Sequence, residues 1–379
     1  MRTQQPIAGA MSRSTRATSP DLTVERAPNG SVKLTPEQAE LFGVELDALR
    51  REIVADLGQH DVDHIRRVIR LCRVTEVGGR LLLHFGFGPL SFLLGTTSLT
   101  VAKILENMEI GHNVMHGQYD WTNDDTLHSM SYEWDIACTA EDWRRYHNYE
   151  HHTFTNIIGK DRDIGYGLLR VSSDQPWSPA YLVQPVSALI LASLFQWGVA
   201  THPLQVEDLA TGDVSLKGFH TRAKPFLRKA RWQLFKDYGL FPALALGNAP
   251  RVFAGNMLAN FGRNLWTFAI IFCGHFPDGA QTYFEEETEG ESRGQWYVRQ
   301  LNGSANIEGS HAFHVMTGHL SHQIEHHIFP DLPASRYPQV AERVKELCVR
   351  YGQAYNTGSF AKQIGSVAKK VLKFALPGS

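Results

Sequence analysis

Long apolar stretches alternate with charged, amphipathic segments along this chain. Residues 81–105, continued to Met115, consist mainly of Leu, Phe, Gly and Thr. This stretch predicts a tight pair of short membrane spans, broken near residues 95–97. Residues 181–200 contain neither an acid nor a base, and about 20 such residues cross the hydrocarbon core of a bilayer. Residues 258–276 are interrupted by Arg263 but otherwise predict a fourth crossing.

These segments predict an all-α integral membrane protein, with about four transmembrane helices in two hairpins and a helical cap. A basic segment with interleaved aromatic residues lies between the third and fourth predicted spans, and 240–246 follows it as an interfacial prelude. Its cations are Lys217, Arg222, Lys224, Arg228, Lys229, Arg231 and Lys236. Positive loops stay in the cytoplasm, so we expect this segment and the cap to face that side. A soluble protein remains the alternative, because core helices reach similar lengths.

The two ends of the chain differ from the apolar centre. Residues 1–20 carry Arg2, Arg13 and Arg16, with no acid and no apolar run, which predicts a disordered arm over 1–34 and no secretory signal. Thr35, Pro36 and Gln38 form the pattern of a helix start, with a threonine cap and a capping box. We therefore expect amphipathic cytoplasmic helices over 35–79, a membrane domain over 80–335, and cytoplasmic helices with a tail over 336–379.

Composition removes several functional classes. The chain has 379 residues, 43% of them hydrophobic, and a formal net charge of −2. A protein with this balance is neither disordered nor a typical nucleic-acid binder. Its four cysteines are scattered without a Cys-x-x-Cys pair, so they predict neither a disulfide framework nor a cysteine metal site.

Three histidine clusters lie close to the apolar stretches. The first contains His112 and His116, the second His147, His151 and His152, and the third Gln323, His326 and His327. Residues three or four apart lie on one face of a helix, so each cluster can present several imidazoles together. Adjacent histidines point about 100° apart around the helix axis, which suits two neighbouring ions. Burying so many rings without a metal would cost several kcal/mol, so we expect a two-metal centre.

Other metal chemistries fit the same residues less well. Residues 147–151 and 322–326 both match the His-x-x-Glu-His pattern of an inverted zinc protease, but a zinc hydrolase needs one such helix and leaves the first cluster unexplained. The spacings Glu109 to His112 and Glu308 to His311 resemble a soluble carboxylate di-iron bundle, which the apolar spans disfavour. A metal transporter or storage protein would need polar residues within its spans, and 181–200 has no charged residue or histidine.

In this order, the three clusters and the apolar segments around them resemble the membrane fatty acid desaturase family over about residues 80–335. The segments 111–117, 143–147 and 323–330 are close to those of bacterial acyl-CoA desaturases of the linoleoyl-CoA type. The resemblance implies a non-haem di-iron site with His112, His116, His147, His151, His152, His326 and His327 as ligands. It also implies a ligand from the last membrane helix, for which His275 is best placed. Gln323 stands where many relatives have histidine, as in the front-end type, which desaturates between an existing double bond and the carboxyl end. Its amide oxygen could bind weakly or through water.

The resemblance further implies a reaction and its partners. Dioxygen and two external electrons would remove two hydrogens from adjacent methylene groups of a fatty acyl-CoA or acyl-lipid, leaving a cis double bond and water. Gly86 and Gly88 lack the third glycine of a dinucleotide fingerprint, so we expect a separate ferredoxin or flavin-dependent reductase. The site would face the cytoplasm at the cell inner membrane. A lipid or alkane hydroxylase on the same scaffold is the alternative, because one scaffold can host several chemistries.

Several further groups near the clusters receive secondary roles. Glu109, Glu150 and Glu325 stand close enough in sequence to orient imidazole N–H groups. Four histidines around the third cluster are expected to be outer partners or surface residues: His311, His314, His319 and His322. Six isolated histidines receive no role: His60, His64, His84, His128, His202 and His220. The basic residues before the fourth span suit either coenzyme A phosphates or anionic lipid.

Overall fold

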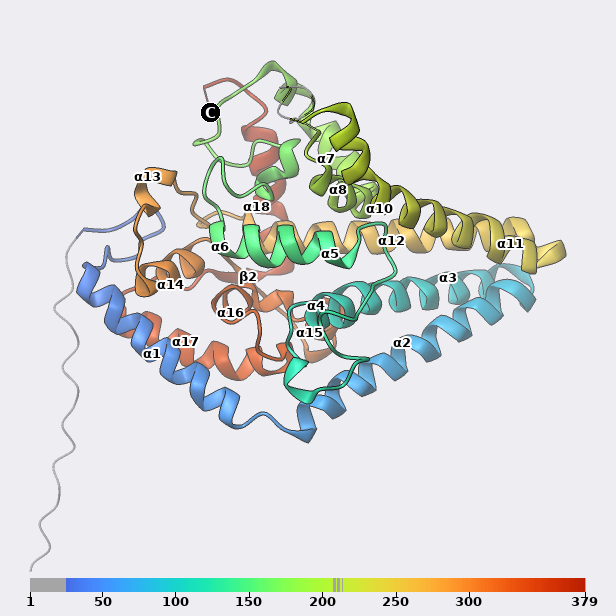
Figure 1. Cartoon of the computed structure of the whole chain (residues 1–379), viewed down its shortest axis with the longest axis horizontal. Helices are drawn as coiled ribbons and strands as arrows, with labels where there is room; N and C mark the ends of the chain where they lie inside the picture. Colours follow the sequence, from blue (N-terminus) through green and yellow to red (C-terminus); the bar gives the residue numbers. More distant parts are fainter. Residues whose placement is uncertain (1–24, 207–208, 210–211, 213, 379) are drawn as a thin grey trace, which may run out of the picture.

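The computed structural model describes residues 25–206, 209, 212 and 214–378, and it is mostly helical. Four long segments run together toward one narrow end of the molecule (Figure 1): α2 (Gln59–Phe85), α3 (Gly88–Leu105), α10 with α11 (Leu216–Phe235 and Phe241–Leu244), and α12 (Ala249–His275). The opposite, broad end contains the shorter helices and both termini of the described chain. Two short parallel strands, β1 (Asn306–Glu308) and β2 (Thr357–Ser359), lie there as well.

The broad end is organised around helix α1 (Pro36–Ala55). Its start is as predicted: Thr35 caps the helix, Pro36 follows, and Gln38 completes a capping box. Phe42, Leu46 and Ile53 are buried against α14 (Arg293–Asn302), α16 (Gln323–Ile328) and α17 (Tyr337–Tyr351). Of the predicted N-terminal arm, residues 1–24 lie outside the described residues, whereas Arg26 and Val32 form an antiparallel bridge.

The first hairpin turns at a different place from the predicted one. The expected break near residues 95–97 is wrong, because α3 continues through them and the chain instead reverses at Gly86 and Phe87. Gly95 is a packing residue: a Cβ there would lie 3.1 Å from the Gly79 carbonyl oxygen of α2. Glycine thus allows the two helices to approach closely. The turn uses Gly88 at a positive φ of 73°, which glycine adopts at little cost.

The predicted span 181–200 is not one straight helix. It divides into α7 (Gln184–Ser193) and α8 (Phe195–Thr201), and the segments on the two sides of the break meet at 93°. The Asn264 side chain of α12 satisfies the backbone at this break, since its Nδ2 donates to the Ser193 carbonyl oxygen and its Oδ1 accepts from the Gln196 N–H. An apolar run cannot reveal such a break when the stabilising partner lies 70 residues away.

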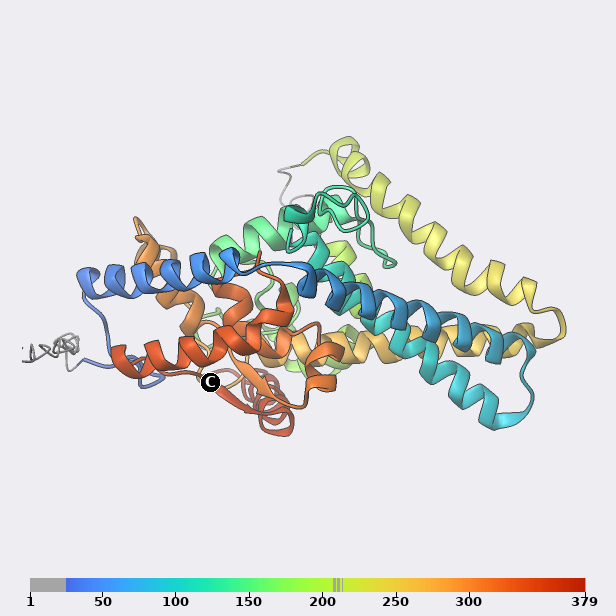
Figure 2. The ribbon, with the colours of Figure 1, turned by 90° about the horizontal axis from the view of Figure 1, so that it is seen from below.

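The second hairpin also has a different partner from the expected one. The π-helical turn η7 (Lys236–Leu240) joins α10 to α11, and the chain then returns along α12. Figure 2 shows α10 and α12 meeting at the narrow end, so the basic segment is itself a long helix of the hairpin. Arg263 is buried within α12 and bonds to Asn264 and Asn260.

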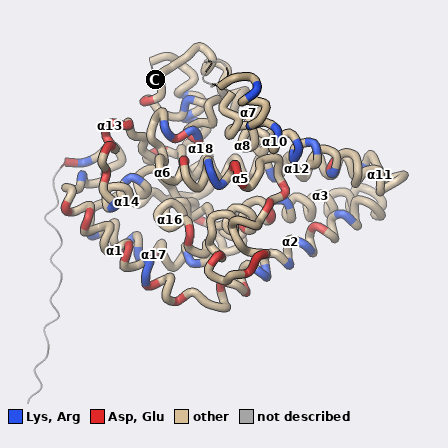
Figure 3. Tube along the Cα trace, viewed as in Figure 1, with Lys and Arg blue, Asp and Glu red and all other residues tan. Residues whose placement is uncertain are grey.

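The four predicted crossings are not confirmed. Within the described residues, only the helix Gly88–Met115 is long and apolar enough to cross a membrane, and the bent pair Pro179–Ser193 with Phe195–Leu204 would make a second. Large apolar side chains are nevertheless exposed around the narrow end, where α11 carries no charge (Figure 3). They include Phe85, Phe87, Leu90, Leu93, Leu244, Leu246, Phe253 and Met257. A group of exposed large apolar side chains at one end of a molecule is typical of an interaction site.

Candidate metal centre

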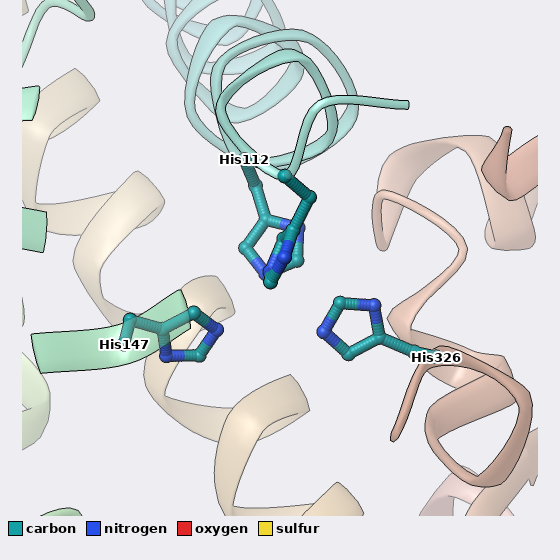
Figure 4. Close-up of side chains that lie close together, drawn as sticks. His112, His147 and His326 are labelled. Atoms are coloured by element: carbon teal, nitrogen blue, oxygen red, sulfur yellow. The ribbon is translucent and has the colours of Figure 1, made fainter. Parts of the chain in front are cut away.

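Eight histidines from four distant parts of the chain meet between the long helices and the broad end. They are His112, His116, His147, His151, His152, His275, His326 and His327, all of them predicted ligands. Figure 4 shows His112, His147 and His326 pointing toward one another from three different segments. Seven of the eight are buried, and His147 is nearly so. We call this group the histidine centre.

Residues of the first two histidine clusters lie in two π-helical turns. Helix α3 passes into η1 (Glu106–His112), followed by α4 (Asn113–Met115), while α5 (Ala140–Trp143) passes into η3 (Arg144–His151). The four-residue spacing still places the rings together: the centroids of His112 and His116 are 4.6 Å apart, and those of His147 and His151 5.1 Å. π-helical turns are rare and frequently mark functional sites.

The ligand atoms divide into overlapping groups, in each of which all atoms lie within 4.8 Å of one another. His112, His116, His147 and His326 form one group, and His151, His275 and His327 form another. His152 lies between the two, grouped with both His326 and His327. This arrangement is compatible with two adjacent ions, each surrounded by nitrogen atoms. The two-metal centre expected from the doubled histidines stays a prediction.

The inward-facing nitrogens have no hydrogen-bond partner. The Nε2 atoms of His112, His116, His147, His151, His152, His326 and His327 are all buried and unpartnered. Buried polar atoms are normally hydrogen-bonded, because leaving one unsatisfied costs about 1–3 kcal/mol. Such a concentration of unsatisfied imidazole nitrogens fits ligation of metal ions, which uses the same lone pairs.

Outer partners hold several rings by their other nitrogen. His151 Nδ1 lies 3.0 Å from both Asp161 carboxylate oxygens, and His147 Nδ1 lies 3.5 Å from Asp163. His327 Nδ1 donates to Gln300 at 2.9 Å. These partners fix the ring orientation and direct Nε2 inward, as outer partners of metal-bound histidines do. They were missed in the sequence, because nothing in their spacing links them to the clusters.

The charge state of the rings is set by burial and by these carboxylates. Burial, with neighbouring rings adding to it, holds the pKa of His152, His326 and His327 well below the ordinary value. Burial also opposes a charge on His151, but Asp161 and Asp163 outweigh it and raise the pKa of His151 to about 9. Most of the centre is therefore neutral at pH 7 and presents free lone pairs.

The remaining predicted groups occupy distinct places. Gln323 lies against His275, with its Nε2 3.0 Å from the His275 Nε2, so its role as a ligand stays a prediction. Glu325 accepts hydrogen bonds from Asn306 and Tyr355 rather than from an imidazole. Glu150 forms no hydrogen bond with the centre within the described residues. His202, which received no role, bonds to the Arg162 carbonyl oxygen and lines the cavity beside His147.

A mostly apolar cavity opens against the histidine centre. His112 and His147 form part of its wall, next to Trp143. The rest is lined largely by apolar and aromatic side chains, including Ile136, Tyr166, Phe195, Val199 and Ile271. An apolar cavity that ends at reactive groups suits a hydrocarbon chain better than a polar metabolite.

Comparison with known proteins identifies a family and relatives that match most of the chain. The family model for fatty acid desaturases matches residues 85–359. The chain is 45% identical over 348 residues to an NADPH-dependent stearoyl-CoA 9-desaturase of Mycobacterium tuberculosis, covering 91% of this chain and 82% of the relative. It is 27% identical over 278 residues to an sn-1 linoleoyl-lipid 6-desaturase of Synechocystis, covering 71% and 77%. The model match covers well over half of the chain, and on this ground the protein belongs to the fatty acid desaturase family.

Proposed function

We propose that this protein introduces a cis double bond into a long-chain fatty acyl-CoA, using a pair of iron ions held by the histidine centre. The observation that carries the proposal is the set of buried, unpartnered Nε2 atoms facing one another beside an apolar cavity. Membership of the family and the stearoyl-CoA 9-desaturase relative support the substrate class. When bound, the iron pair would supply dioxygen activation, which breaking an unactivated C–H bond requires.

The protein's own residues would position the chain and orient the ligands. The eight histidines, with Gln323 beside His275, are the residues that would hold the metals. Trp143 and the apolar cavity wall would hold the acyl chain so that only certain methylenes reach the centre, since geometry distinguishes chemically similar carbons. The same wall excludes water from the reacting positions.

We further propose that the narrow end lies in a membrane and that electrons come from a separate reductase. The exposed apolar side chains of α3, α11 and α12 support the first statement, because they would otherwise face water. The relative is described as NADPH-dependent, which favours a reductase that oxidises NADPH over a ferredoxin alone. We place the histidine centre on the cytoplasmic side, because the cations of the basic helix α10 favour that side.

Turnover of acyl-CoA by purified protein with NADPH and a reductase tests the proposal. Stearoyl-CoA and linoleoyl-CoA are offered separately, because the relative acts on stearoyl-CoA whereas Gln323 resembles front-end enzymes. We expect loss of two hydrogens from stearoyl-CoA. His151→Ala should abolish turnover, while the exposed His220→Ala should retain it. A product that has gained an oxygen atom would instead show a hydroxylase, and turnover by His151→Ala would contradict the ligand assignment.

A further inference from the structure

A second cluster of metal-ligating side chains lies beside the histidine centre but outside it. His64 from α2, Glu109 from η1 and His319 from the turn before α16 meet, with their ligand atoms within 4.8 Å of one another. His64 Nε2 lies 2.8 Å from one Glu109 carboxylate oxygen, and His319 Nδ1 lies 2.9 Å from the other. The aromatic neighbours of His319 are His64, His311 and His314, and none of them belongs to the histidine centre.

The carboxylate of Glu109 requires a compensating positive charge. Its side chain is 1% exposed, and within the described residues its ion pairs are with His64 and His319 alone, with no lysine or arginine. A buried carboxylate without a cation is costly. Two imidazoles and one carboxylate form a common ligand set for a divalent transition metal, found both in zinc enzymes and in non-haem iron sites.

The backbone around His319 is held in an uncommon conformation that brings its ring to Glu109. Gly318 and His319 both have positive φ, 66° and 54°. A Cβ at Gly318 would lie 2.6 Å from the Met108 carbonyl oxygen, so only glycine permits this approach to η1. His319 has a Cβ and no such freedom, and a non-glycine residue in this region is uncommon. Strained backbone of this kind persists where the surroundings impose it, often at binding sites.

A row of further histidines connects this cluster to the surface. His311 is exposed, and its ring centroid lies 6.5 Å from that of His319. The rings of His314 and His322 are 4.5 Å apart, and both nitrogens of His322 are buried without a hydrogen-bond partner. His311 therefore places an exposed imidazole next to the ring of His319.

We propose that His64, Glu109 and His319 form a separate site for a single divalent transition metal, such as zinc or ferrous iron. The site connects three elements distant in sequence: α2, η1 and the turn before α16. It also stands behind the histidine centre, because the Asn113 Nδ2 lies 3.5 Å from a Glu109 oxygen while the Asn113 Oδ1 lies 3.1 Å from the His112 Nδ1. An ion bound to Glu109 would therefore also help to fix Asn113, which contacts His112.

Metal counting on the full-length protein tests this site. The protein is depleted of metal, reloaded anaerobically with ferrous iron or with zinc, desalted, and analysed for metal per chain. We expect about three ions in the unaltered protein, two in the histidine centre and one at the new site. His64→Ala should lose about one ion and keep the others, whereas His220→Ala on the exposed face of α10 should keep all of them.

A second variant guards against misfolding at the strained position. His319→Asn suits the left-handed backbone, because asparagine tolerates positive φ better than most residues, and it should also lose about one ion. If it fails to fold, His64→Ala decides alone, since His64 lies in regular helix. Equal metal content in His64→Ala and the unaltered protein would overturn the site. His327→Ala should reduce only the content of the histidine centre, so failure of the proposed iron pair is detected separately.

Discussion

At the scale of single residues, spacing identified the inward-facing rings but not the residues that orient them. His112, His116, His147, His151 and the paired histidines that follow repeat at helical intervals, and the structure places all of them together. Asp161 follows His151 by ten residues and reaches it through a turn in the chain, so no periodicity points to it. His64 was dismissed as isolated for the same reason: its partner Glu109 lies 45 residues away.

Asp161 offers a direct test of ring orientation. Its carboxylate accepts from His151 Nδ1 and from the backbone N–H groups of Asn156 and Asp163. Asp161→Asn keeps the shape but removes the charge, so we expect about a 10- to 100-fold loss of iron affinity. Competition with a chelator of known affinity measures this change. The control is Glu150→Gln, next to His151 in sequence but with no hydrogen bond to the centre in the described part of the chain. An equal loss in both variants would contradict the role of Asp161.

At the scale of helices, the sequence predicted apolar content better than the position of turns and breaks. The cap at Thr35 was found because all of its partners are local. Gly95 was wrongly predicted to lie in a turn, because the sequence around it does not reveal that it packs against Gly79 of the neighbouring helix. The break at Leu194 depends on Asn264, and the π-helical turns that hold the first two clusters have no sequence signature.

Close packing between α1 and α14 provides a test at this scale. A Cβ at Gly294 would overlap the Ala39 carbonyl group, and Gly43 packs against Gly294 from the facing helix. Gly294→Ala should therefore lower the free energy of unfolding by about 1–3 kcal/mol, measured as a fall in the melting temperature in detergent. Gly365→Ala in α18 (Phe360–Lys373) meets open space and should be neutral or slightly stabilising. The reverse order would contradict the packing.

At the scale of the whole molecule, the sequence predicted a helical protein with a histidine-rich centre, but not the shape that holds it. Two hairpins were expected, but both of those in the described residues differ from the prediction. The first pairs α2 with α3 instead of two halves of 81–115, and the second pairs the basic α10, rather than residues 181–200, with α12. A charged helix such as α10 looks like a soluble segment in a hydropathy pattern. Its pairing with α12 depends on packing between the two helices, which cannot be predicted from the sequence of either helix alone.

Membrane placement of the narrow end can be tested by cysteine labelling. The four native cysteines are buried and free, so an introduced cysteine should dominate the reaction with a membrane-impermeant maleimide. Phe87 and Leu246 are 89% and 83% exposed at the narrow end, and Val349 is 82% exposed on α17. In membrane vesicles with the cytoplasmic face outward, Phe87→Cys and Leu246→Cys should stay unlabelled while Val349→Cys reacts. Rapid labelling at all three positions would place the narrow end in water.

The most direct test of the central claim is an anomalous-difference map at the iron absorption edge from crystals of the iron-loaded protein. Two strong peaks should lie inside the histidine centre, one near His112, His116, His147 and His326, and one near His151, His275 and His327. The buried nitrogens of these rings that lack a hydrogen-bond partner are the atoms that would bind the two ions. An iron-loaded crystal with no peak among these histidines would contradict the account.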